Sequence, residues 1–304
     1  PDSKTILANA QEFRNDILNA FHHVQSLAPL FKLQDGTWVP EYPTQVYAPS
    51  PIADFYAGED VGRSWCYDVE LGAHHLIPQG VMDPQSKDAK WMMDHMEDLQ
   101  FLKDGWFYYP AEGNRKDWYN LGGFAKVQPY YARTVEVYAL QDDVKAFIRS
   151  YFNTVITLLN KEDLSLWEHF MNGAYNKTHE TGYFLHQSAT MLVTTREDSL
   201  WLAPFVTNNW MKDGMVVAVD NAPTRFGNVS YRITSHVDKG YIEASITPPT
   251  RETPKEIVIR LRNPEGKHMK SVEVNGKDYK LFDPIKETIT LKPGQASVLV
   301  KALY

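Results

Sequence analysis

The sequence predicts a multidomain chain of mixed α and β structure, with an α-helical hairpin domain over residues 1–215 and an all-β sandwich domain over residues 216–304. Two observations predict this division. Before about residue 215, apolar side chains recur at the three- and four-residue spacing of helices, and loops rich in Trp, Tyr, Gly and Asn separate the helical stretches. Beyond that point, short β-branched runs alternate with turn sequences, which is typical of a sandwich.

Helical periodicity accounts for the first domain. Apolar side chains recur every three or four positions over residues 5–28, and Pro29 cannot continue a helix, so an amphipathic helix is predicted there. Asp83-Pro84 is a typical helix start, and Asp142 is the expected N-cap of a later helix. Further helices are predicted over residues 62–81, 85–102, 130–140, 144–159 and 180–195. These helices, taken as antiparallel pairs, predict an array of α/α hairpins.

Alternating β-branched residues and turn chemistry account for the second domain. Asn275-Gly276 lies between two such runs, and this dipeptide is the strongest short-range signal of a β-hairpin. Asn263-Pro264 and Pro293-Gly294 mark other turns. Strands are predicted over residues 216–219, 229–236, 241–247, 256–262, 271–274, 288–291 and 296–302.

Composition and charge exclude several classes of protein. With 304 residues, 43% of them hydrophobic and 23% charged, the chain is long enough for two folded domains and lacks the composition of a disordered protein. The net charge is −7 without a basic cluster, so no nucleic-acid partner is expected. No run of about 18 apolar residues occurs, so no membrane insertion is expected either.

Cysteine usage and the start of the chain give weaker indications. Cys66 is the single cysteine, which excludes an internal disulfide and a thiolate metal cluster. The chain begins at Pro1 rather than at methionine, so a leader or an N-terminal segment is expected to have been removed. A periplasmic or secreted location is expected rather than a cytoplasmic one.

Four segments of the sequence resemble an α/α-toroid, or six-hairpin, glycoside hydrolase with a C-terminal β-sandwich: residues 58–70, 118–124, 176–183 and 200–204. The resemblance implies a bacterial enzyme of polysaccharide degradation that hydrolyses a poly- or oligosaccharide, by an inverting mechanism and without a cofactor. The predicted helices are about half of those in a complete toroid. A missing N-terminal segment or a partner chain would then complete it, and could supply one catalytic carboxylate.

Glu180 is the first candidate for a catalytic carboxyl group. Glycoside hydrolysis needs two such groups on either side of the scissile bond. Glu180 follows a segment rich in Asn, Gly and Thr at the start of a predicted helix, and His179 beside it is a candidate for binding sugar hydroxyls. Alternatively, Glu180 only stabilises the positive end of that helix, worth about 0.3–1 kcal/mol. The catalytic assignment requires that Glu180 face an open pocket rather than lie buried.

A second acidic segment supplies candidates for the partner carboxyl group. Asp68 and Glu59 are the preferred catalytic partners, with Glu70 as a weaker alternative, and Arg63 and Trp65 are candidate substrate-binding residues. The alternative is a buried network of ion pairs that fixes helix packing.

Aromatic segments supply further candidates for substrate binding, because aromatic rings stack on sugars. Trp118 and Tyr119, with Lys126 nearby, form one such segment, and Trp167 and Glu168 form another. Core packing is the alternative, because aromatic residues make up 13% of the chain and most must be buried.

The histidines do not predict a metal site. His74-His75 and Asp94-His95 lack the spacing of known zinc motifs, so packing roles are expected and no metal is predicted.

Two other functions stay open. One is an α/α-toroid polysaccharide lyase, in which Tyr119, Asn120, His179 and Arg63 would take part. A funnel with net positive potential and a Tyr–His pair would favour the lyase, whereas facing carboxylates would favour the hydrolase. The other is a non-catalytic glycan-binding module. In each case the sandwich is expected to act as a structural support.

Overall fold

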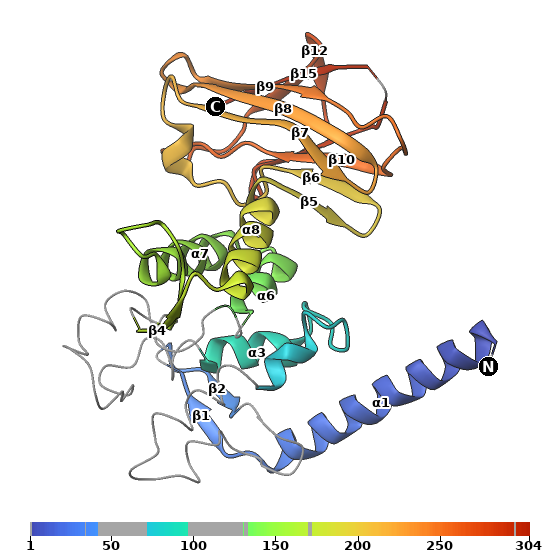
Figure 1. Cartoon of the computed structure of the whole chain (residues 1–304). Helices are drawn as coiled ribbons and strands as arrows, with labels where there is room; N and C mark the ends of the chain where they lie inside the picture. Colours follow the sequence, from blue (N-terminus) through green and yellow to red (C-terminus); the bar gives the residue numbers. More distant parts are fainter. Residues whose placement is uncertain are drawn as a thin grey trace. The chain divides into compact units, whose positions relative to one another are not determined.

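The computed structural model describes residues 2–33, 35–41, 72–96, 130, 133–169, 172–294 and 296–304 (Figure 1). The chain divides into two compact units, Pro1–Phe184 and Leu185–Tyr304. We call them the helical unit and the two-sheet unit.

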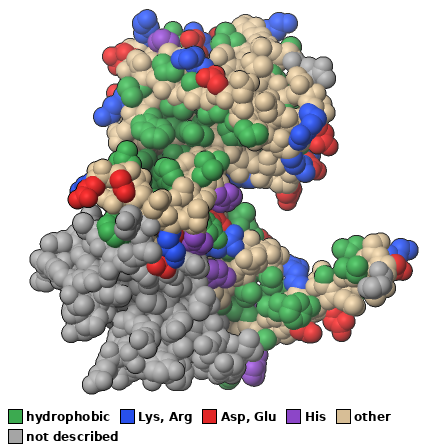
Figure 2. Space-filling model, viewed as in Figure 1, with side chains coloured by type: hydrophobic (Ala, Val, Ile, Leu, Met, Phe, Trp, Pro, Cys, Tyr) green, Lys and Arg blue, Asp and Glu red, His purple; other side chains and the backbone are tan. Residues whose placement is uncertain are grey.

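Helix α1 (Ser3–Leu27) confirms the prediction of an N-terminal amphipathic helix. The Asp2 side chain caps it by accepting a hydrogen bond from the Thr5 N–H at 2.8 Å, and the helix ends before Pro29. Phe21 and Val24 near its C-terminal end are buried. The apolar residues of its first half, with Ile6 and Phe13 among them, are exposed along the helix (Figure 2).

A short hairpin and two helical segments follow. Strands β1 (Leu30–Lys32) and β2 (Trp38–Pro40) pair in antiparallel fashion. The 3₁₀ helix η2 (Ala73–Leu76) is followed by turns, so the predicted α-helix is wrong over residues 72–81. Gly80 there has a left-handed φ of 73°, which an α-helix excludes. Helix α3 (Lys87–Met96) starts two residues later than predicted.

Helices α6 (Thr134–Gln141) and α7 (Val144–Leu158) form a helical hairpin through a two-residue connection. The prediction that Asp142 is the N-cap of the second helix is wrong. Asp143 is the cap, because its side chain accepts from the Ala146 N–H at 3.0 Å. Asp142 instead terminates α6 with a left-handed φ of 58°, a conformation that Asp tolerates better than most residues.

Strands β3 (Trp167–His169) and β4 (Asn172–Tyr175) pair as a hairpin immediately before helix α8 (Thr178–Leu192). The helix starts two residues before the predicted Glu180. It begins in the helical unit and ends in the two-sheet unit.

The two-sheet unit contains a five-stranded sheet in the order β13-β14-β10-β6-β5 and a six-stranded sheet in the order β12-β11-β15-β9-β8-β7. The strands are β5 (Val193–Arg196), β6 (Ser199–Leu202), β7 (Val216–Thr224), β8 (Gly227–His236), β9 (Tyr241–Thr247), β10 (Glu256–Arg260), β11 (Ser271–Val274), β12 (Lys277–Tyr279), β13 (Phe282–Asp283), β14 (Thr288–Leu291) and β15 (Val298–Leu303). Two 3₁₀ helices, η5 (Asn208–Met211) and η6 (Val237–Lys239), complete the unit.

Each of the seven predicted strand segments contains a strand, with ends that differ by a few residues. The Asn275-Gly276 turn is also confirmed, because both residues have positive φ (51° and 73°) and join β11 to β12. Strands β5 and β6 were not predicted. Because β6 pairs with β10 in parallel, the five-stranded sheet is complete only when residues before 216 are included, and the unit starts at Leu185.

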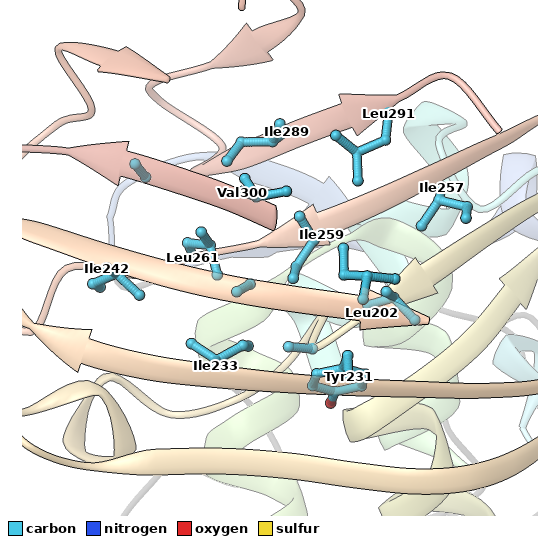
Figure 3. Close-up of a cluster of buried hydrophobic side chains, with 14 of the residues drawn as sticks. Leu202, Tyr231, Ile233, Ile242, Ile257, Ile259, Leu261, Ile289, Leu291 and Val300 are labelled. Carbon is cyan, nitrogen blue, oxygen red and sulfur yellow. The ribbon is translucent and has the colours of Figure 1, made fainter. Parts of the chain in front are cut away.

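One hydrophobic core joins the two sheets (Figure 3). Side chains alternate along each strand, so Tyr231 and Ile233 of β8 point inward while their neighbours point outward. They meet residues of the other sheet such as Leu202, Ile259 and Ile289, all fully buried. Burial of this apolar surface at about 25 cal/mol per Å² is the main stabilising contribution.

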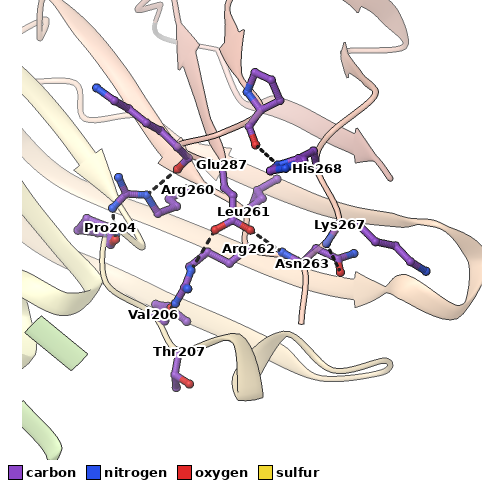
Figure 4. Close-up of polar contacts among 12 residues, drawn as sticks. Pro204, Val206, Thr207, Arg260, Leu261, Arg262, Asn263, Lys267, His268 and Glu287 are labelled. Carbon is purple, nitrogen blue, oxygen red and sulfur yellow. Dashed lines mark hydrogen bonds and ion pairs between the residues drawn. The ribbon is translucent and has the colours of Figure 1, made fainter. Parts of the chain in front are cut away.

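A buried arginine network fixes the loops beside this core (Figure 4). Arg260 donates to the backbone oxygens of Pro204 and Lys286. Arg262 forms an ion pair with Glu287 at 3.2 Å, and Glu287 also accepts from the Asn263 N–H. Each charge therefore has partners, which is the condition under which charged side chains can be buried.

None of the described helices combines the length and the apolar composition needed to cross a lipid bilayer.

Candidate functional site

The structure describes four of the predicted site residues, Trp167, Glu168, His179 and Glu180. The other predicted residues lie outside the described residues: Glu59, Arg63, Trp65, Asp68, Glu70, Trp118, Tyr119, Asn120 and Lys126. Their roles stay predictions.

Glu180 lies in the first turn of α8 and is 1% exposed. Its Oε1 lies 3.1 Å from Nδ1 of His179, whose side chain is partly exposed. Its other oxygen, Oε2, is buried and has no hydrogen-bond partner among the described residues. The His179 imidazole thus contacts Oε1 of Glu180, whereas Oε2 is available to another donor.

The burial of Glu180 bears directly on its predicted role. A catalytic carboxyl group must be reached by its substrate, and the burial of Glu180 does not meet the requirement that it face an open pocket. Catalysis at Glu180 therefore requires movement of the groups that cover it. The alternative role, stabilisation of the positive end of α8, agrees with the same burial.

Aromatic rings border the Glu180–His179 pair. The His179 and Tyr183 rings meet edge to face with centroids 4.8 Å apart, and Tyr183 stacks on Tyr130 at 6.0 Å. Tyr130 is 1% exposed, and burial raises its pKa, helped by the nearby Tyr151 and by the charge of Glu180. Its hydroxyl therefore stays protonated at any pH at which the protein works.

Sequence reasoning missed Tyr183 and Tyr130. Tyr183 could have been found, because it lies four residues after His179 on the same face of α8. Tyr130 could not, because no local pattern links it to a helix that starts at Thr178.

Glu168, predicted to bind sugar hydroxyls, forms an ion pair with Lys177. Both side chains are partly exposed, one from β3 and the other from the residue before α8. The pair ties the β3–β4 hairpin to the start of the helix that bears His179 and Glu180.

Several described histidines outside this site contact other aromatic rings. His74 and His75 contact each other at 4.5 Å, and His95 lies 4.7 Å from Phe31. Burial lowers the pKa of His95 to about 3, so His95 is neutral near pH 7. Within the described ranges, no three His, Cys, Asp or Glu side chains gather as metal ligands would.

The chain matches no protein-family model and no curated protein sequence. Among solved structures, it is similar to a GH127 β-L-arabinofuranosidase from Geobacillus stearothermophilus T6, with 11% identity over 84% of this chain and 44% of that one and a TM-score of 0.35. It is also similar to an α-L-rhamnosidase from Dictyoglumus thermophilum, with 10% identity over 79% of this chain and 25% of that one and a TM-score of 0.40.

A second GH127 β-arabinofuranosidase gives 10% identity, 87% and 45% coverage, and a TM-score of 0.40. The chain therefore spans less than half of the length of each of these three proteins.

Proposed function

We propose that the chain is a glycoside hydrolase, or the C-terminal part of one, that acts on a poly- or oligosaccharide by an inverting two-carboxylate mechanism. The observation that carries the proposal is the pairing of Glu180 with His179 beside the rings of Tyr183 and Tyr130. Carboxyl groups beside aromatic rings are what glycoside hydrolysis needs, one for proton transfer and the other for stacking on the sugar.

In this proposal, the two oxygens of Glu180 have separate tasks. His179 engages Oε1 and fixes the orientation of the carboxyl group. Oε2 is then the atom that exchanges a proton with the glycosidic oxygen or with the attacking water. The second carboxyl group comes from Glu59 or Asp68, or from a segment or partner that completes an α/α toroid.

An inverting mechanism places the two carboxyl groups about 6.5–9.5 Å apart, with room for a water molecule between them. Trp167 and Glu168 on β3, together with Arg63, Trp65, Trp118, Tyr119 and Lys126, are the proposed substrate-binding residues. The two-sheet unit is proposed to be a β-sandwich that supports the helical unit structurally. The protein is proposed to be periplasmic or secreted, because polysaccharide substrates lie outside the cytoplasm.

The test is the release of reducing ends from a panel of plant and microbial polysaccharides by the full chain, with Glu180→Gln as the variant. Loss of a proton-transferring carboxyl group typically costs about 10²–10⁴-fold in rate, so kcat should fall by that factor. Glu243→Gln is the matched control, because Glu243 is a partly exposed carboxylate of β9 in the two-sheet unit.

The initial anomeric configuration of the product, read by NMR, tests the inverting course. Equal activity of Glu180→Gln and the wild type would assign Glu180 to the structure of α8 alone. Absence of hydrolysis on every glycan of the panel would remove the hydrolase proposal.

One observation favours the lyase as a second candidate. The edge-to-face contact of His179 with Tyr183 is a Tyr–His pair, the arrangement expected of an enzyme that removes a proton next to a uronate carboxyl group. Uronate-containing polysaccharides in the same panel test it, because a lyase produces unsaturated uronates that absorb ultraviolet light. If the wild-type chain forms unsaturated uronates and His179→Ala does not, the lyase proposal would replace the hydrolase proposal.

A further inference from the structure

Packing explains the ring of Tyr130 but not its hydroxyl. The ring packs against Leu158 and Leu166 and stacks on Tyr183 with an interplanar angle of 14°. The hydroxyl is buried and has no hydrogen-bond partner among the described residues. A phenylalanine would pack equally well and would leave no polar atom unsatisfied, so the hydroxyl calls for a functional reason.

A continuous series of contacts connects Tyr130 to Glu180. Tyr130 stacks on Tyr183, Tyr183 meets His179 edge to face, and His179 lies against Oε1 of Glu180. At the other end, Oε2 of Glu180 is also buried and also lacks a partner. One donor and one acceptor without partners therefore belong to the same four-residue cluster.

Charge gives the direction of the interaction. The charge of Glu180 is felt at Tyr130, where it adds to the effects of burial and of Tyr151 in raising the pKa. A tyrosine that stays protonated can only donate to a carboxylate. The two side chains come from different elements, Tyr130 from the residues before α6 and Glu180 from α8, so their interaction also fixes the start of α8.

We propose that Tyr130 is a positioning residue of the candidate site: its hydroxyl donates a hydrogen bond to a bridging water that in turn donates to Oε2 of Glu180, while its ring holds His179 against Oε1 through Tyr183. The assignment of Glu180 as a catalytic carboxyl group rests on the proposed function. The hydrogen bond itself does not, because it concerns only groups of this chain.

The experiment is a ¹³C NMR titration of the Glu180 carboxyl carbon in the full chain. A donor to the ionised form lowers a carboxyl pKa, so Tyr130→Phe should raise the pKa of Glu180 by about one unit, a tenfold change in the acid dissociation constant. Tyr231→Phe is the matched control, because Tyr231 is a buried tyrosine of the two-sheet unit that bonds to Leu192. It should leave the Glu180 titration unchanged.

Other titratable groups near the cluster can add steps to the Glu180 titration curve, so the experiment must separate them. They are His179 and Tyr183 on α8, Tyr151 on α7, and the Glu168–Lys177 pair. The titration is therefore repeated in His179→Gln, which removes the imidazole step and leaves the effect of Tyr130→Phe in place.

A second measurement keeps Tyr130 intact. The ¹³C shift of the Tyr130 Cζ carbon in the otherwise wild-type chain should follow the ionisation of Glu180, and the step should vanish in Glu180→Gln. If Tyr130→Phe leaves the pKa of Glu180 unchanged, or if Tyr130 Cζ shows no such step, the proposal is overturned.

Activity distinguishes this proposal from the proposed function. Where glycan hydrolysis is measurable, Tyr130→Phe should move the pH profile of kcat by the same amount as the Glu180 pKa and leave KM unchanged. A shifted Glu180 pKa in a chain that hydrolyses no glycan would remove the hydrolase proposal and keep the role of Tyr130.

Discussion

Buried polar side chains of the two-sheet unit meet partners inside it, whereas several in the helical unit do not. In the first, the Tyr231 hydroxyl donates to Leu192 O at 2.9 Å, and Ser235 Oγ donates to Met211 O at 2.7 Å. In the helical unit, these buried oxygens have no hydrogen-bond partner among the described residues: Tyr130 Oη, Glu136 Oε1, Ser150 Oγ, Ser165 Oγ and Glu180 Oε2.

The difference concerns how completely the buried polar groups of each unit are satisfied. An unsatisfied buried polar group costs about 1–3 kcal/mol, so a unit with fewer such groups loses less folding stability to them. Such groups call for a further partner, such as a bound water or a ligand. In the two-sheet unit, Gln187 Oε1 is also without a hydrogen-bond partner among the described residues, and it lies on α8, the helix that begins in the helical unit.

The largest effect is expected in the core of the two-sheet unit. Ile259→Ala removes a fully buried side chain from β10, and it should lower the free energy of unfolding by about 2–5 kcal/mol in urea denaturation. Leu299→Ala in β15 is the control, because Leu299 is about half exposed, and its effect should be below about 0.5–1 kcal/mol. Equal effects of the two substitutions would contradict the core described for this unit.

An effect of intermediate size is expected from acid, which should lower the free energy of unfolding of the helical unit through His95. Burial lowers the pKa of His95 to about 3, so the unfolded chain binds the proton more readily than the folded one. Stability from this group is full above pH 6.5 and is lost as the pH falls toward 3, by about 1.4 kcal/mol per pH unit at most.

His95→Phe should therefore flatten the pH dependence of unfolding of the helical unit over that range, as followed by circular dichroism. His186→Gln is the control, because His186 is exposed on α8. An unchanged slope in His95→Phe would show that other groups cause the acid sensitivity.

Strands of the two-sheet unit could be predicted because their signals are local. Alternating β-branched residues and turns such as Asn275-Gly276 decide the structure within ten residues or fewer. Strands β5 and β6 were missed because they follow α8 directly, and because their place in the sheet depends on pairing with β10, more than fifty residues later. Long-range pairing of this kind leaves no local pattern.

Glu180 and His179 could be predicted as site candidates because chemistry-bearing residues crowd one short segment. The burial of Glu180 could not be predicted, since it depends on the tertiary packing around α8. Tyr130 joins them only through stacking on Tyr183, a contact between distant parts of the chain. Propensity arguments find reactive residues, but not the side chains that position them.

The smallest effect concerns the α6–α7 connection, where neighbouring aspartates have opposite tasks. Asp143→Ala removes the N-cap of α7 and should cost about 1 kcal/mol in free energy of unfolding. Asp142→Gly should be neutral or stabilising, because Asp142 has a φ of 58° that glycine adopts without strain.

Chemical denaturation of the two variants checks both. A larger loss from Asp142→Gly than from Asp143→Ala would restore Asp142 as the cap and reverse the assignment made from the hydrogen bond to Ala146.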